Sequence, residues 1–307
     1  MSETSQLTTD VEYAAHIVRN GGVIGMPTET VYGLAARADR ENSVGRIFDI
    51  KGRPRNHPLI AHLGPNADPA QWGHMNTHAE SLASQFWPGP LTILVPRTTR
   101  VPDWVTGGRD TVGLRVPSHR MTQELLSLVP EAVVAPSANK FGRVSPTTAL
   151  HVLNDLGNEV DCVLDGGPCA IGLESTIVEC VGKSVTILRP GAVTAAEISR
   201  LLDIELVLET GDSRAPGMLL SHYAPLATVH LVASVENART VTKDLELEKF
   251  KVEILHYDDV YEYALHLYDR LRRADFDGVD HVVAVLPSGQ GLSEAIRDRL
   301  KKAAATT

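Results

Sequence analysis

Four basic residues stand beside turn-forming residues and could together bind an anion. Lys51 and Arg53 lie in the stretch IKGRP, Arg115 lies in TVGLRV, and Arg189 precedes a Pro-Gly pair. Arginine offers a planar fork of donors for phosphate or carboxylate, and lysine offers a compact charge. The chain has neither a GxxxxGK[ST] nor a GxGxxG phosphate loop. A nucleotide site would therefore depend on these side chains, although basic residues at element ends can also be solvated or answer a helix dipole.

Hydroxyl and amide side chains follow two apolar runs. Ser137 and Asn139 lie in PSAN, directly after residues 132–135, and Ser175 and Thr176 lie in GLEST. Such residues can bind phosphate or ribose, or simply cap a turn. Both interpretations stay open on the residues alone.

Three further residue types could carry chemistry. His62 lies inside the apolar stretch PLIAHL, where a histidine is either a ligand or a satisfied core residue. Glu29 and Glu174 could form an acid–base pair, although no spacing supports this. No Ser-His-Asp or Cys-His order indicates a hydrolase, and the three cysteines have no metal-ligand spacing. We interpret those cysteines as packing thiols of a protein in a reducing cytoplasm.

The elements that must position these residues alternate between strands and helices. Residues 1–205 predict an α/β domain, a twisted open mixed sheet with helices on its faces, whose first eight residues are expected to be frayed. Residues 228–307 follow a βαβαβα pattern, which predicts a small Rossmann-like three-layer α/β domain. Residues 206–227 have no steady period and predict a linker. Because Met218–Leu220 and Tyr223 make it too apolar for a simple tether, we expect it to act as a lid.

Composition and charge favour a globular protein and argue against a membrane protein or an unspecific nucleic-acid-binding protein. The chain has 307 residues, 43% hydrophobic and 22% charged, as in soluble globular proteins. A net charge of −9 argues against unspecific coating of nucleic acid. No apolar run reaches the roughly 20 residues that span a bilayer, and the N-terminus lacks the features of a secretory signal. We expect a cytoplasmic protein without membrane contact.

Taken together, the polar segments resemble those of a known family. PTETVYGL, KGRP, HPLIAHL, WPGPLT, DTVGLRVP, APSAN, RVSPT, GLESTI and LRPG follow in the order found in YrdC-like threonylcarbamoyl-adenylate synthases. The resemblance covers about residues 8–203. The later APGMLLSHYAPLA and the small α/β module resemble the long, two-domain form of the family.

The resemblance implies a reaction and its partners. L-threonine, bicarbonate and ATP would give threonylcarbamoyl-AMP and pyrophosphate, with Mg²⁺ accompanying the triphosphate and no organic prosthetic group. The product would feed the threonylcarbamoyladenosine modification of tRNA through a downstream transferase complex, and direct contact with tRNA is possible. The chemistry needs positioning and neutralisation of phosphate charge.

The resemblance also implies site residues. Those expected to hold threonine are Thr30, His62, Arg115, Ser175 and the main chain at Ala135. Those expected to form the catalytic, phosphate-binding set are Lys51, Arg53, Ser137 and Asn139. Those expected to line the ATP pocket are Arg53, His57, Thr111, Ser137, Ser145, Arg189 and Tyr223, with His222 beside the last. His57 replaces an asparagine found in many members, and no side chain is expected to ligate a metal.

Two rival functions are compatible with parts of the sequence. One is a double-stranded RNA-binding module that uses a basic cleft without catalysis, which the net charge disfavours. The other is the carbamoyltransferase of hydrogenase maturation, which contains a similar domain. That class also needs an acylphosphatase segment and paired CxxC motifs, and the latter are absent here.

Overall fold

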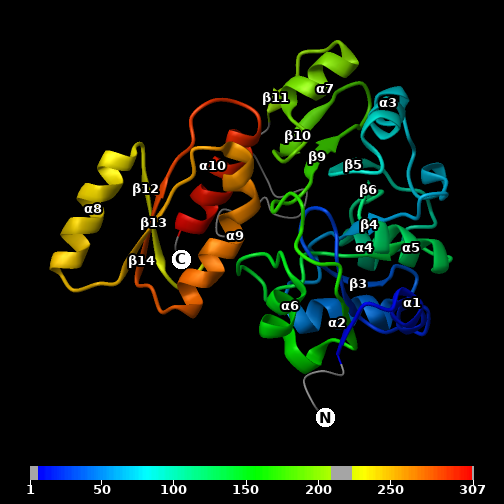
Figure 1. Ribbon diagram of the computed structural model, residues 1–307. Coiled ribbons are helices and arrows are strands. Elements are labelled where there is room, and N and C mark those ends of the chain that lie inside the picture. The colour runs from blue at the N-terminus through cyan, green and yellow to red at the C-terminus, as the bar shows by residue number, and fades with distance from the viewer. Residues whose placement is uncertain (1–5, 209–222, 306–307) are drawn as a thin grey trace.

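Two separate sheets organise the computed structural model, which describes residues 6–208 and 223–305. The larger sheet is built by the N-terminal part of the chain, and the smaller one by the C-terminal part (Figure 1). The lid expected from Met218–Leu220 and His222 lies outside the described residues.

Within the described part of the chain, the larger sheet has eleven strands in the order β1-β8-β2-β3-β7-β4-β6-β5-β9-β10-β11. Its strands are β1 (Leu7–Thr8), β2 (Ile24–Met26), β3 (Gly33–Arg37), β4 (Ile60–His62), β5 (Leu91–Pro96), β6 (Thr111–Arg115), β7 (Val133–Val134), β8 (Cys162–Leu164), β9 (Thr176–Glu179), β10 (Thr186–Arg189) and β11 (Val207–Leu208). The sheet contains both parallel pairs, such as β4–β6 and β5–β9, and antiparallel pairs, such as β5–β6 and β2–β3. The predicted mixed sheet is therefore confirmed.

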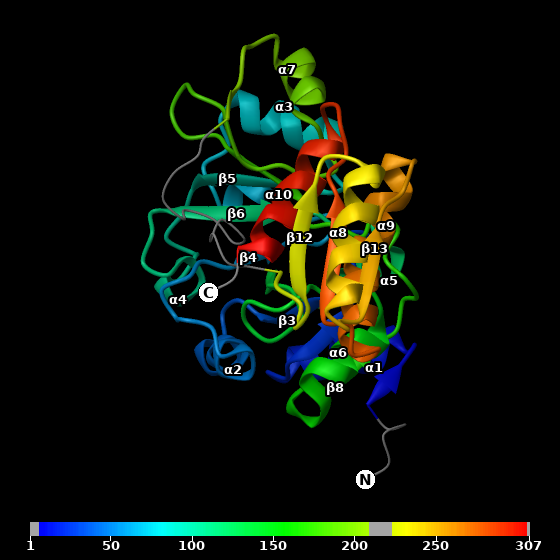
Figure 2. The same ribbon diagram turned by 90° about the vertical axis from the view of Figure 1, so that its left-hand side faces the viewer.

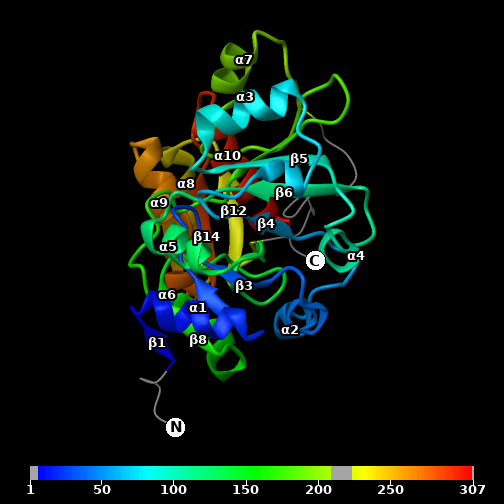
Figure 3. The same cartoon turned by 90° about the vertical axis from the view of Figure 1, so that its right-hand side faces the viewer.

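Helices cover both faces of this sheet. They are α1 (Val11–Arg19), α2 (Glu41–Lys51), α3 (Thr77–Phe86), α4 (Asp103–Thr106), α5 (Arg120–Leu128), α6 (Ala149–Leu156) and α7 (Ala195–Leu202). Along β3, Leu34 and Ala36 pack into the core that includes residues of α2, α3 and α6, whereas Ala35 packs into the core formed with α1 and α5. Successive strand residues point to opposite faces, so these two cores lie on opposite sides of the sheet (Figure 3).

Local sequence signals set the ends of several helices. The Asp10 side chain accepts a hydrogen bond from the backbone N–H of Tyr13 and caps α1. Gly52, with φ +65°, ends α2 in the left-handed conformation that glycine favours. Thr194 and Glu197 form a capping box at the start of α7.

Three segments differ from the sequence-based prediction. Leu7–Thr8, expected to be frayed, pairs with β8 as an edge strand. Val207–Leu208, expected in the linker, pairs with β10 and extends the sheet. Gly33–Arg37 forms β3, which the sequence did not predict because its small residues GLAAR show no alternation of apolar and polar types.

The C-terminal part is a three-layer α/β unit, as predicted. Its parallel sheet has the order β12-β14-β13, and its elements are β12 (Thr228–Val232), α8 (Val235–Leu247), β13 (Val252–Leu255), α9 (Val260–Phe276), β14 (His281–Val285) and α10 (Leu292–Ala304). Helix α8 covers one face of this sheet, and α9 and α10 lie between the sheet and the larger part (Figures 1 and 2).

The two parts share one apolar core. Val31, Val144 and Leu173 of the larger part pack in the same cluster as Leu267 and Tyr268 of α9. This packing fixes α9 and α10 against the loops that follow the central strands.

Candidate active site

A cavity of about 50 Å³ brings together most of the residues expected to bind substrates. It is lined by Thr30, Val31, Arg53, Ile60, His62, Arg115, Ala135, Pro136, Ser137, Glu174, Ser175, Arg189 and Tyr223. The expected threonine-binding set is thus gathered in one place. Three arginines line the same small space, which concentrates positive charge there.

Arg115 and His62 form one wall because β4 and β6 are parallel and set these two residues opposite each other. Nη2 of Arg115 donates to Oε1 of Glu29 at 2.8 Å and to Oγ1 of Thr30 at 2.9 Å. Burial alone would raise the pKa of the Glu29 carboxyl, but Arg115 lowers it below its ordinary value. Glu29 is therefore an ionised partner that orients Arg115.

The buried His62 ring is neutral at neutral pH. Burial and the nearby charge of Arg115 lower its pKa to about 3, and Nδ1 lies 3.2 Å from the carbonyl oxygen of Ile60. A neutral imidazole can contact a substrate by hydrogen bonding without adding charge to the cavity.

Arg189, the last residue of β10, and Ser175, which directly precedes β9, line the same cavity and contact each other. The Arg189 guanidinium donates through Nε at 3.0 Å and Nη2 at 2.9 Å to the carbonyl oxygen of Ser175, and through Nη2 to its Oγ at 3.1 Å. A Cβ on Gly191 would lie 2.4 Å from the backbone nitrogen of Thr176, so only glycine allows this approach of the two segments.

Arg53 lacks a carboxylate partner within the described parts of the chain. Its Nη2 donates to the carbonyl oxygen of Pro58 at 3.1 Å, whereas its buried Nε has no hydrogen-bond partner there. Burial lowers the pKa of Arg53 to about 10, which leaves it charged at neutral pH. Because a buried donor normally has a partner, this guanidinium fits an anionic ligand.

Lys51 and Asn139 lie behind the loop whose Ser137 lines the cavity. Nζ of Lys51 donates to the carbonyl oxygens of Ser137 at 2.5 Å and Asn139 at 2.6 Å, and burial lowers the lysine pKa well below its ordinary value. The amide of Asn139 donates to the carbonyl oxygens of Lys140 and Arg143. Both side chains therefore shape the loop, and neither lines the cavity.

Three expected ATP-binding residues are also outside the cavity lining. His57 packs edge-on against Phe141, with ring centres 5.6 Å apart. Thr111 begins β6, whereas Arg115 ends it, so they are separated by about 13 Å along the strand. Ser145 donates from Oγ to Oε1 of Glu174 at 2.6 Å and so contacts the lining indirectly.

Glu174 is bound from the C-terminal part of the chain, which the sequence did not predict. Its Oε2 accepts hydrogen bonds from Nε of Arg299 and from the hydroxyl of Tyr268, both at 2.8 Å. Burial would raise the pKa of Glu174, but Arg299 and Arg189 lower it to about 2. Glu29 and Glu174 are thus each ionised and bound to an arginine, and neither holds the proton that an acid–base pair requires.

A signal for Arg299 is present in the sequence of α10. Arg299 falls on the same helical stripe as Leu292, Ile296 and Ala303, at spacings of three and four residues. A charged residue on an otherwise apolar stripe predicts a buried ion pair.

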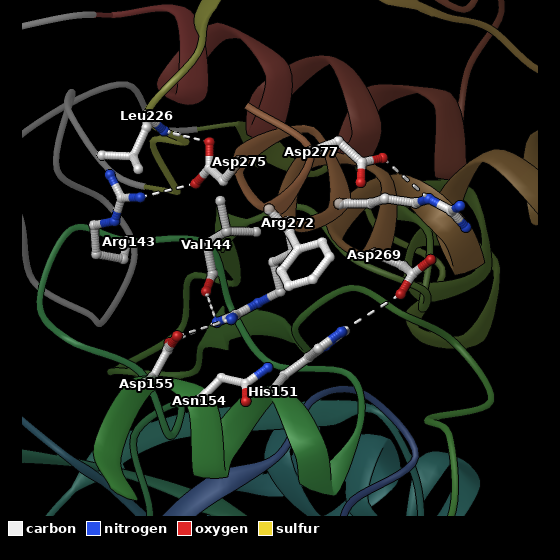
Figure 4. A pocket seen from close by; sticks show the side chains of 12 residues that line it. Arg143, Val144, His151, Asn154, Asp155, Leu226, Asp269, Arg272, Asp275 and Asp277 are labelled. Atoms are coloured by element: carbon white, nitrogen blue, oxygen red, sulfur yellow. Dashed lines mark hydrogen bonds and ion pairs between the residues drawn. The ribbon is translucent and has the colours of Figure 1, made fainter. Parts of the chain in front are cut away.

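A larger cavity of about 770 Å³ lies between the two parts of the chain (Figure 4). Its basic groups face acidic ones: Arg143 and Asp275 at 2.8 Å, Arg272 and Asp155 at 2.7 Å, and His151 and Asp269 at 3.4 Å. Because these charges are mutually satisfied, this cavity is a weaker candidate for anion binding than the arginine-lined one.

The described residues contain no group of three or more His, Cys, Asp or Glu side chains arranged to hold a metal ion. Within residues 6–208 and 223–305, no helix combines the length and the apolar character needed to cross a bilayer.

Fold and site define a two-domain α/β protein in which three buried arginines line one cavity. Residues 16–191 match the Sua5/YciO/YrdC family model, described as Telomere recombination, and residues 193–305 match the model described as Threonylcarbamoyl-AMP synthase, C-terminal domain. The chain belongs to the threonylcarbamoyl-AMP synthase family.

Relatives match along nearly the whole chain. Threonylcarbamoyl-AMP synthase of Pyrococcus abyssi is 37% identical, with 95% of this chain and 93% of the relative covered. The Bacillus subtilis enzyme of the same name is 34% identical, with 98% and 95% covered. The crystal structure of P. abyssi Sua5 complexed with L-threonine superposes with a TM-score of 0.91 at 37% identity, covering 96% of this chain and 94% of that one.

Proposed function

We propose that this protein is a threonylcarbamoyl-AMP synthase, which converts L-threonine, bicarbonate and ATP to threonylcarbamoyl-AMP, pyrophosphate and water. The single observation that carries the assignment at the site is Arg53, a charged, buried guanidinium whose Nε has no partner among the described residues. It lines the same cavity as Arg115 and Arg189.

The reaction has two bond-forming steps. The threonine amine adds to bicarbonate with loss of water and gives an N-carboxylate. One oxygen of that carboxylate then attacks the α-phosphorus of ATP, and the bond to the β-phosphate oxygen breaks, so that pyrophosphate leaves with the electron pair. Charge accumulates on phosphate oxygens throughout this transfer, which is the charge that fixed guanidinium groups stabilise.

For threonine, we assign its carboxylate to Arg115. Glu29 and Thr30 hold Nη2 of Arg115 and orient the guanidinium toward the cavity that it lines. Contacts to the rest of the substrate are assigned to Thr30, His62, Ser175 and the main chain at Ala135. The P. abyssi Sua5 structure is a complex with L-threonine, and this supports the choice of substrate.

For ATP, we assign the phosphates to Arg53, Arg189 and Ser137, with Lys51 and Asn139 holding the Ser137 loop. The proposed contacts of Ser145, Tyr223, His57 and Thr111 surround this centre. Mg²⁺ fits as a companion of the triphosphate, because phosphate oxygens and water satisfy its preference for oxygen ligands. The cavity is much smaller than the roughly 300–1,000 Å³ of ligand pockets, so a wall must move to admit both substrates.

The alternative of a double-stranded RNA-binding module is not supported. The exposed fractions of Arg53, Arg115 and Arg189 are 8%, 4% and 4%. Buried guanidinium groups cannot reach the backbone phosphates of a duplex, which are contacted by exposed basic residues. We propose that tRNA enters downstream, through a transferase that consumes the product.

The test is release of pyrophosphate by the purified protein with ATP and Mg²⁺. Release should require both threonine and bicarbonate and should be lost in Arg53→Ala. Arg55→Ala is the matched control, because Arg55 lies two residues away with its side chain 63% exposed and bound to Asp49. Release that is indifferent to threonine, or equal loss in both variants, would contradict the assignment.

A further inference from the structure

Glu174 lies where the C-terminal part of the chain reaches the active-site cavity. Glu174 lines that cavity, and its carboxylate is held by Ser145 on Oε1 and by Arg299 and Tyr268 on Oε2. Two of its three partners therefore come from α10 and α9. Gly172 allows this contact: a Cβ there would lie 2.6 Å from the carbonyl oxygen of Ala264 in α9, and its φ is +81°.

Arg299 contacts Glu174 and Pro190, and the chain neighbours of these two residues, Ser175 and Arg189, line the cavity. Its side chain is fully buried, with Nε on Glu174 at 2.8 Å and Nη2 on the carbonyl oxygen of Pro190 at 3.0 Å. Glu174 precedes Ser175, and Pro190 follows Arg189. The contact of Arg189 with Ser175 is therefore held on both sides by a single residue of α10.

The same guanidinium supports Tyr223, the first described residue of the C-terminal part. It lies over the Tyr223 ring at 5.4 Å, and the Tyr268 ring is stacked against Tyr223 at 5.5 Å with an interplanar angle of 26°. A cation over an aromatic face is attractive, so Arg299 and Tyr268 together fix this wall of the cavity.

The positive charge of Arg299 also affects the cavity, because it compensates the charge of nearby carboxylates. Asp298 accepts a hydrogen bond from Nη1 of Arg299 at 2.5 Å and one from Lys302 at 2.8 Å, so the local group has two carboxylates, Glu174 and Asp298, and two cations. Without Arg299, Glu174 would face the phosphate-binding cavity as a poorly compensated negative charge beside Arg189. Such a charge would compete with ATP for that arginine.

We propose that Arg299 is a positioning residue of the active site, through which packing of the C-terminal part and binding of ATP favour each other. It holds the segments of Glu174 and Arg189 in place and neutralises Glu174 next to the phosphate site. The inference rests on the proposed function, because ATP is the ligand. Coupling is reciprocal, so bound ATP also stabilises the contacts of α10.

The experiment measures binding of ATP with Mg²⁺, without threonine or bicarbonate, by isothermal titration calorimetry. Arg299→Met should weaken binding by roughly tenfold, within the range common for coupled sites. Glu174→Gln in the same chain, as a double variant, should recover most of that loss because it removes the uncompensated carboxylate. Removing both partners of a buried ion pair also recovers stability, so the free energy of unfolding of the same variants is measured by denaturant titration. A merely structural role for Arg299 would leave the ATP affinity of the folded fraction of Arg299→Met equal to that of the wild type.

Arg143→Met is the matched control. Its ion pair with Asp275 also crosses between the two parts of the chain but lies at the larger cavity. ATP binding by this variant should equal that of the wild type. Unchanged binding in Arg299→Met, or a double variant that binds no better than Arg299→Met, would overturn the inference.

A second measurement does not depend on the folding of Arg299→Met. Backbone amides of α10 in the wild-type protein should exchange with deuterium more slowly when ATP and Mg²⁺ are added, and this effect should shrink in the double variant. Equal exchange with and without ATP would overturn the inference while leaving the synthase assignment intact. A wild-type protein that binds no ATP would overturn both.

Discussion

His62 and Arg115 lie directly opposite each other across the parallel pair of β4 and β6. This register puts a cation beside the imidazole, and burial together with that cation lowers the pKa of His62 and keeps the ring neutral. The cavity consequently receives its positive charge from fixed guanidinium groups, which do not titrate near neutral pH.

The neutral state of His62 predicts a pH dependence of stability. Its folded pKa of about 3 lies below the ordinary 6.5, so the unfolded chain binds the proton more readily. This contribution to stability is present above pH 6.5 and is lost as the pH falls toward 3. Urea unfolding between pH 8 and pH 4 should show a smaller loss in His62→Gln than in the wild type. Parallel curves would contradict the prediction.

Arg115 and Glu29 should be strongly coupled in stability. Arg115→Met leaves a buried carboxylate without its partner, and we expect unfolding to become easier by about 3–5 kcal/mol. The double variant Glu29→Gln/Arg115→Met should recover much of this loss but not pyrophosphate release. Denaturant titration gives the free energies, and independent, additive effects of the two changes would refute the coupling.

The lowered pKa of His57 predicts that this residue affects ATP affinity only under acidic conditions. Burial and the charges of Arg53 and Arg109 lower its pKa below 6.5, so it is uncharged at neutral pH. ATP should bind the wild type and His57→Asn equally at pH 7.5. On acidification below pH 6.5, protonation adds a positive charge near the phosphates, so the wild type should gain affinity relative to the variant. Calorimetric titrations that diverge at pH 7.5 would argue against this.

Comparing substitutions at Gly172 and Gly167 tests whether the close packing of α9 requires a glycine at position 172. Both have a positive φ, +81° and +78°, but only at Gly172 would a Cβ meet the backbone of Ala264 and Leu265. Gly167→Ala should cost about 1–2 kcal/mol of unfolding free energy through its backbone conformation. Gly172→Ala should cost more and should reduce ATP binding, because it displaces α9 from Glu174. Similar stabilities of the two variants would show that the contact is easily relieved.

Much of the fold was predictable because its signals are local. Asp10 and Gly52 mark helix ends by capping chemistry, and the apolar runs of β4, β7 and β14 stand out between polar turns. The edge strands β1 and β11 were missed because two residues carry no periodicity. Their pairing depends on neighbours far away in sequence, Val163 in β8 and Thr186 in β10.

The sequence predicted which residues form the site, but it did not predict how their side chains contact one another. The motifs identified Arg53, Arg115 and Arg189, and the structure gathers them around one cavity. That Lys51 binds the carbonyl oxygens of Ser137 and Asn139 could not be predicted, because it depends on how a helix end meets a distant loop. The ion pair of Glu174 with Arg299 joins residues 125 positions apart and follows only from the packing of α10.

The apolar cluster that joins Val31, Val144 and Leu173 to Leu267 and Tyr268 has a consequence for folding. Loops of the larger part and elements of the C-terminal part both contribute to this cluster, so exposing it to water destabilises both parts at once. We therefore expect the protein to unfold in one cooperative transition, in which the C-terminal sheet does not persist alone. The unfolding of the chain is thus expected to be cooperative because the two parts share a core, although they contain separate sheets.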